Sequence, residues 1–137
     1  MYLELGEMYV NHLLPPLKQV LNEQLNIFEM LLDNLNSIQK ATISNHTNML
    51  KDLLEQQNLL LEHQNNIKIK ALEIINTSKE LLNISNQSED TSMKEIINKL
   101  NIPEAEELNE ILQNIELKHD RIRELNEINK KLTQNAL

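Results

Sequence analysis

The chain has 137 residues, enough for one domain, with a formal net charge of −8 and no cysteine. The negative charge argues against nucleic acid and anionic membrane surfaces as partners, because both require a basic face, and the lack of cysteine excludes disulfides and thiolate sites. No apolar run reaches the roughly 18 residues of a membrane span, and the first residues carry no basic leader, so we expect a soluble cytoplasmic protein without membrane insertion.

Residues that break helices are rare in this sequence. The only glycine is Gly6, and the prolines are Pro15, Pro16 and Pro103. β-Sheets need frequent turns with positive φ, which one glycine cannot supply. Aromatic residues make up 2% of the chain, which favours a thin core between a few packed helices over a thick globular one. The sequence therefore predicts an all-α fold.

The first long helix is predicted to begin at Pro15–Pro16, since proline is tolerated in a first turn, with residues 1–14 as an N-terminal extension. Apolar residues then recur at heptad spacing, as expected of a helix that packs along one face on a partner helix. They are Leu17, Leu21, Phe28, Leu31, Leu35 and Ile38. Polar residues at Ala41–Thr47 predict a turn between helices, although one continuous helix is the competing interpretation.

A second helix is predicted over Thr47–Leu82, with leucine and isoleucine again at heptad spacing. Two helices of similar length joined by a short turn form an antiparallel hairpin, placed here at residues 15–84. Gln57, Gln64 and Ser78 interrupt the apolar stripe. They either fix the register or face solvent, and we favour solvent.

Residues 85–92 are polar and aperiodic, so they are predicted to be a linker before a C-terminal segment, residues 93–137. Ser92 and Glu95 have the spacing of a capping box that would start a short helix. A third long helix follows Pro103, with glutamates in its first turn and an apolar stripe that Lys118, His119 and Asp120 interrupt. The whole is expected to be a coiled-coil-like helical bundle.

No motif for catalysis, for a cofactor or for a metal stands out. The four histidines include no pair at helical metal-binding spacing, and no glycine-rich phosphate loop is possible with Gly6 alone. Glu116 and His119 have the Glu-x-x-His spacing of di-iron bundles, which need two such pairs. A single copy is better explained as an exposed polar patch, so we expect a non-enzymatic protein without metal or cofactor.

The apolar stripes are wider than a two-helix hairpin can bury. The surplus must pack on the third helix, on another copy of the chain or on a client helix. A self-contained three-helix bundle without a groove is an equally good interpretation of these features alone.

The chain resembles the FlgN family of flagellar export chaperones over residues 17–137. The first helix carries Leu21-x-x-x-Leu25-x-x-x-Glu29-x-Leu31-Leu32-x-x-Leu35, and the second carries Leu50-x-x-Leu53-Leu54-x-x-Gln57 and Ala71-Leu72-Glu73. A polar linker and the terminal Asn126-x-x-Asn129-x-x-Leu132 complete the match. Residues 1–14 depart from the family layout.

The resemblance implies a bacterial cytoplasmic chaperone of type III flagellar export. It would bind the helical termini of hook-associated proteins of the hook–filament junction, FlgK and FlgL, and would meet components of the export apparatus. The family's C-terminal part is its client-binding region. On this chain the partner-binding residues implied are Leu108, Leu112, Ile115, Ile122, Leu125, Ile128, Asn129 and Leu132. The alternatives are a structural coiled-coil protein that homo-oligomerises and another helical secretion adaptor.

Overall fold

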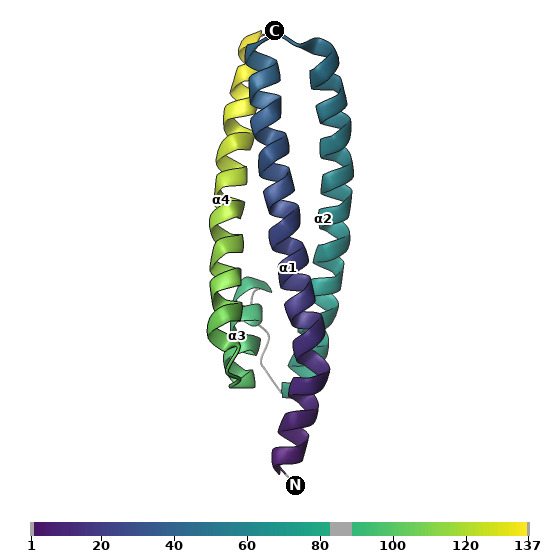
Figure 1. Ribbon diagram of the computed structural model, residues 1–137, viewed down its shortest axis with the longest axis vertical. Helices are drawn as coiled ribbons and strands as arrows, with labels where there is room; N and C mark the ends of the chain where they lie inside the picture. Colours follow the sequence, from purple (N-terminus) through teal and green to yellow (C-terminus); the bar gives the residue numbers. More distant parts are fainter. Residues whose placement is uncertain (1, 83–88, 137) are drawn as a thin grey trace. The chain divides into compact units, whose positions relative to one another are not determined.

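A computed structural model describes residues 2–82 and 89–136, with side chains described for residues 11–82 and 93–135. Four helices account for nearly all of this part of the chain (Figure 1). They are α1 (Tyr2–Ile43), α2 (Thr47–Leu82), α3 (Glu89–Leu100) and α4 (Ala105–Ala136). No strand occurs among these described residues. The predicted all-α fold, with a helical hairpin and a C-terminal helix, is confirmed.

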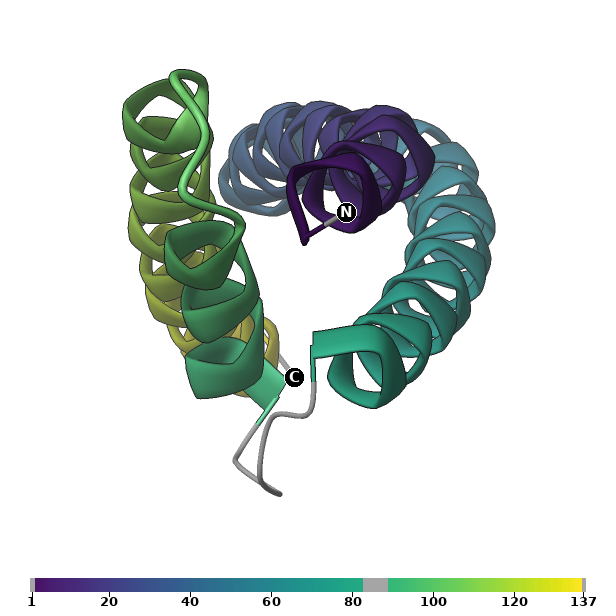
Figure 2. The same cartoon turned by 90° about the horizontal axis from the view of Figure 1, so that it is seen from below.

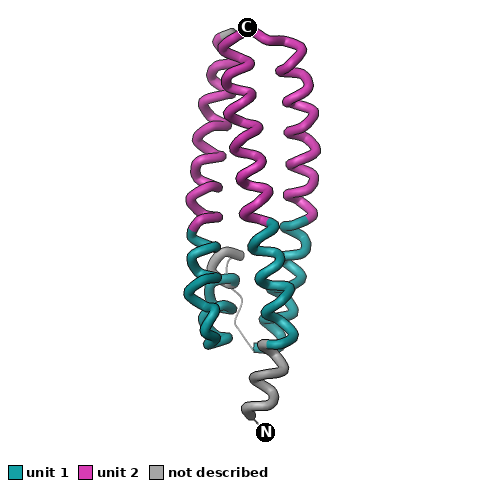
Figure 3. Tube along the Cα trace, in the orientation of Figure 1, with its two compact units in different colours: residues 1–23, 67–113 teal, residues 24–66, 114–137 magenta. Residues whose placement is uncertain are grey.

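The chain divides into two compact units (Figure 3). Unit 1 comprises Met1–Glu23 and Ile67–Gln113, and unit 2 comprises Gln24–Asn66 and Asn114–Leu137. Helices α1, α2 and α4 each contribute one stretch to each unit, whereas α3 belongs to unit 1 alone.

The predicted turn between the first two helices is confirmed at residues 44–46, and the continuous helix is excluded. Asn45 takes the left-handed conformation with φ of 57°. The amide of His46 donates to the carbonyl oxygen of Ala41, and that of Asn45 to Thr42. These bonds form a Schellman motif, in which asparagine tolerates the left-handed position better than most residues with a Cβ.

The predicted helix start at Pro15 is wrong, because α1 begins at Tyr2 and contains both prolines. Proline has a φ suited to a helix, but it removes one amide donor and crowds the preceding turn. Leu13 and Leu17 are both buried, so the apolar face runs through the prolines. Burial of that face offsets the loss of the two hydrogen bonds.

The linker is predicted at residues 85–92, and residues 85–88 of it lie outside the described residues. Glu89 to Ser92 already belong to α3, so the helix starts earlier than the predicted cap at Ser92. The helix predicted after Pro103 is confirmed as α4, with Glu106 and Glu107 in its first turn. The division into extension, hairpin, linker and C-terminal segment stays a prediction.

Unit 1 is built from stretches of all four helices. Figures 1 and 2 both show α3 beside the first turns of α4, where the Asn109 side chain donates to Asn98 over 3.2 Å. Its core consists of buried aliphatic side chains from each helix: Leu13, Leu17, Val20, Leu21, Ile67, Ala71, Ile75, Met93, Ile96, Ile97, Leu100, Leu108 and Leu112. Ser78 is fully buried, so the prediction that it faces solvent is wrong. Its small side chain falls on the helical face of Ala71 and Ile75.

Unit 2 contains three helical stretches, with α1 between α2 and α4 (Figure 3). Its core lies along α1, where apolar side chains are buried at helical spacing: Ile27, Phe28, Leu31, Leu35, Ile38 and Ala41. Leu60 of α2 and Ile115, Ile122 and Leu125 of α4 complete it.

Candidate partner-binding groove

The eight residues that the family resemblance marks for client binding are called here the α4 face. Six of them are buried, namely Leu108, Leu112, Ile115, Ile122, Leu125 and Asn129, while Ile128 and Leu132 are half-buried. Leu108 and Leu112 fall in unit 1, and the other six fall in unit 2. Most of the α4 face is therefore covered in the free chain.

In unit 2 the cover comes from α1. The Asn129 amide donates to the carbonyl oxygen of Leu35 over 3.0 Å, a contact 94 residues apart in sequence. The rings of Phe28 and His119 are stacked with centroids 5.8 Å apart. An ion pair joins Lys118 and Glu29 over 3.8 Å, on the exposed side of the same helix pair. These contacts hold α4 against α1 along several turns.

Helices α1 and α2 are joined in unit 2 by another buried amide. Asn34 donates to the carbonyl oxygen of Leu53 over 3.0 Å and to the side chain of Gln56 over 3.3 Å. Because α1 packs on both neighbours, a hollow forms where α2 and α4 flank it.

This hollow, the unit 2 groove, has a volume of about 420 Å³. Apolar side chains come from all three helices, and the polar ones come from α2 and α4. The lining residues are Phe28, Leu31 and Leu35 of α1, Gln57, Leu61 and Gln64 of α2, and His119, Ile122, Arg123 and Asn126 of α4. An apolar floor with polar edges is the form that receives an amphipathic helix.

Leu61 is the groove residue with the clearest surplus of apolar surface. It is 47% exposed although it is a large hydrophobic side chain. The glutamines on either side of it, Gln57 and Gln64, are half-buried. The two interpretations of the sequence placed these glutamines either in the helix interface or in open solvent. In the structure they line the groove instead.

Only Ile122 of the α4 face lines the groove. The sequence analysis missed His119, Arg123 and Asn126 as lining residues, because it followed the apolar stripe of one helix. The signal that the sequence did give was the width of the apolar stripes, which exceeds what a two-helix hairpin can bury. A groove between three helices depends on their packing, which one helix's periodicity does not give.

The groove carries no arrangement typical of a metal site or a membrane anchor. His119, the histidine of the Glu-x-x-His pattern, stacks on Phe28. Among the residues that the structure describes, no group of three or more His, Cys, Asp or Glu could hold a metal ion. Within that same part of the chain, no helix combines the length and apolar character needed to cross a membrane.

Comparisons with known proteins identify the family. The model of one family, described as FlgN protein, matches residues 8–137 and so confirms the resemblance seen in the sequence. The match begins earlier than predicted, since it includes residues 8–14, which were expected to depart from the family. The searches of curated proteins and of solved structures found no match.

Proposed function

The chain belongs to the FlgN family, which implies a flagellar export chaperone, and we propose that it holds helical segments of hook-associated proteins before their export. The clients would be proteins of the hook–filament junction, FlgK and FlgL, bound in the bacterial cytoplasm through their helical termini. Handover to the export apparatus would follow. The role needs binding and release rather than catalysis.

The observation that carries this proposal is the unit 2 groove. Phe28, Leu31 and Leu35, each 2% exposed, form its floor, and Leu61 in its α2 wall is 47% exposed. A client helix laid there would bury apolar surface at about 25 cal/mol per Å² and would complete a four-helix arrangement with α1, α2 and α4. The free chain thus offers a site without having to unfold any of its own helices.

The α4 face remains part of the proposal as the support of this groove. Leu125 and Asn129 are buried and do not line the groove, so a client could contact them only if α4 left α1. Ile122 is the residue of that face which a docked client would touch directly. We therefore assign client contact to Ile122, and the positioning of α4 to the buried residues of the α4 face.

A homo-oligomeric coiled coil is the second candidate. Its support lies in exposed leucines on α2, Leu54, Leu59 and Leu61. A second copy of the chain could cover them. The melting temperature of such an oligomer would rise with protein concentration. Light scattering separates the two functions, since a chaperone that holds one client helix needs only a monomer.

The test is the affinity of the purified chain for C-terminal helical peptides of the hook-associated proteins of the same genome. Leu61→Asp places a charge in the groove and is expected to weaken binding at least tenfold, because the carboxylate would be desolvated beside the apolar floor. Leu59→Asp is the matched control, since Leu59 is 68% exposed on the same helix and does not line the groove.

Equal binding by both variants and the unchanged protein would refute the groove as the client site. Binding lost equally in both variants would point to the α2 surface in general, against a specific groove. Circular dichroism would check that each variant remains helical, as expected for surface positions.

A further inference from the structure

The charge of the unit 2 groove differs from that of the chain. The protein has 21 acidic residues and a net charge of −8. None of the ten described residues that line the groove is acidic, and its single charged residue is Arg123. The acidic residues of α2 within unit 2, Asp52, Glu55 and Glu62, do not line it.

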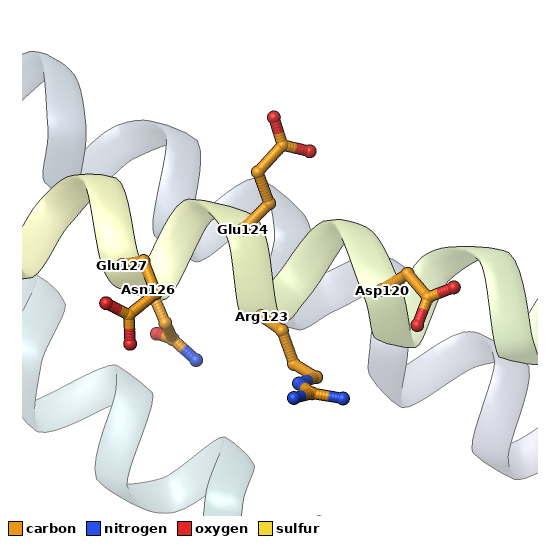
Figure 4. A pocket seen from close by; sticks show the side chains of 5 residues that line it. All are labelled: Asp120, Arg123, Glu124, Asn126 and Glu127. Atoms are coloured by element: carbon orange, nitrogen blue, oxygen red, sulfur yellow. The ribbon is translucent and has the colours of Figure 1, made fainter.

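Arg123 has no ion-pair partner among the residues that the structure describes. Arg123 also lines a second surface hollow on α4, together with Asp120, Glu124, Asn126 and Glu127 (Figure 4). The carboxylate of Glu124, which also lines that hollow, pairs with Arg121 over 3.0 Å. Among the described residues, Arg123 is thus a groove-lining cation without an ion-pair partner.

We propose that Arg123 selects the client helix by pairing with a carboxylate beside that helix's apolar ridge. This inference rests on the proposed function. The occupant is an amphipathic helix whose leucine or isoleucine ridge lies over Phe28, Leu31 and Leu61, with an aspartate or glutamate about one turn along its α4-facing edge. Gln57, Gln64 and Asn126 supply amides that donate to and accept from its other polar side chains.

The physical reason lies in the geometry of guanidinium. Its planar fork can bind a carboxylate through two parallel hydrogen bonds, and the pair is stronger beside an apolar floor from which water is displaced. Because the chain as a whole repels acidic partners, the preference has to come from this local pair rather than from long-range attraction.

The experiment is a double-mutant cycle with the peptide that binds in the affinity test above. Arg123→Gln keeps a polar side chain of similar reach, and each acidic residue of the peptide is changed in turn to its amide. We expect Arg123→Gln to weaken binding about five- to tenfold, and one peptide substitution to weaken binding to the unchanged protein but not to the variant. Arg121→Gln, two residues earlier on the same helix at a position that does not line the groove, should leave the affinity within twofold.

The outcomes separate this inference from the proposed function. If Leu61→Asp abolishes binding while Arg123→Gln has no effect, the groove holds a helix and the charge selection is refuted. If Arg123→Gln tightens binding, the client edge is basic and the inference is equally overturned. If neither variant changes the affinity, the proposed function fails together with it. A dimer of the free chain that Arg123→Gln dissociates would identify the occupant as a second copy and overturn the inference.

Discussion

The side-chain amide of Asn129 donates to the main-chain carbonyl oxygen of Leu35 over 3.0 Å, and thereby joins α4 to α1 inside unit 2. The residue before Leu35, Asn34, makes the corresponding contact in the other direction, to the carbonyl oxygen of Leu53 on α2. A helical carbonyl has a second lone pair and accepts such a bond without losing its own helical partner. Two adjacent positions of α1 therefore fix both walls of the groove.

The first prediction concerns the strength of that contact. Asn129→Ala removes a buried donor and leaves a small cavity, and we expect the free energy of unfolding to fall by about 1–3 kcal/mol. Asn126→Ala is the matched control, because it makes the same change one turn earlier at an exposed position. Both substitutions raise helix propensity equally, so the difference between them in urea unfolding reports the burial alone. Equal stability of the two variants would show that the bond to Leu35 contributes nothing.

The second prediction concerns the turn between α1 and α2. Asn45 has a φ of 57°, so Asn45→Gly should keep or slightly raise the stability, whereas Asn45→Ala should lower it by about 1 kcal/mol. Thermal and urea unfolding measure both variants. His46→Ala, which keeps the amide that bonds to Ala41, should have little effect. A stable Asn45→Ala variant would contradict the left-handed conformation.

The third prediction tests whether α1 extends across its prolines. If Pro15 lies inside the helix, Pro15→Ala restores an amide donor and should raise the free energy of unfolding by about 1–3 kcal/mol. If the helix began at Pro15, the same change would be nearly neutral, because the donor there is unpaired in any case. Pro103→Ala, ahead of α4, is the control and should bring no gain.

The turn and the prolines show how far local sequence rules reach. Ser44, Asn45 and His46 follow a long apolar stripe, and the Schellman turn forms there because asparagine tolerates positive φ. At Pro15 the same kind of local rule failed. The buried Leu13 extends the apolar face ahead of the prolines, and its packing outweighs the proline penalty.

The groove could not have been predicted from one helix at a time. Periodicity identified Leu31, Leu35 and Ile122 as apolar positions, which the structure places in or beside the core. It did not show that Gln64 and Arg123 border the same hollow, since that depends on how α2 and α4 flank α1. The eight residues of the α4 face remain the predicted client-binding set, although six of them are buried within the chain itself.

The fourth prediction asks whether a client binds with α4 in place. The chain has no cysteine, so Glu29→Cys and Lys118→Cys can be joined by a short bismaleimide where the native side chains pair over 3.8 Å. Client affinity should stay within about twofold after linking, because the groove does not require α1 and α4 to separate. The unlinked double variant is the control for the substitutions themselves. Loss of binding only after linking would mean that the client replaces α1 on the α4 face.

The location of the client is measured most directly by methyl NMR of the leucine and isoleucine side chains during titration with the client peptide. The account predicts large chemical-shift changes and peptide contacts for the methyl groups of Leu31, Leu61 and Ile122. The methyl signals of Leu59 and the buried Leu125 should stay nearly unchanged. Shifts concentrated at Leu125, Ile128 and Leu132, with Leu61 unaffected, would contradict it.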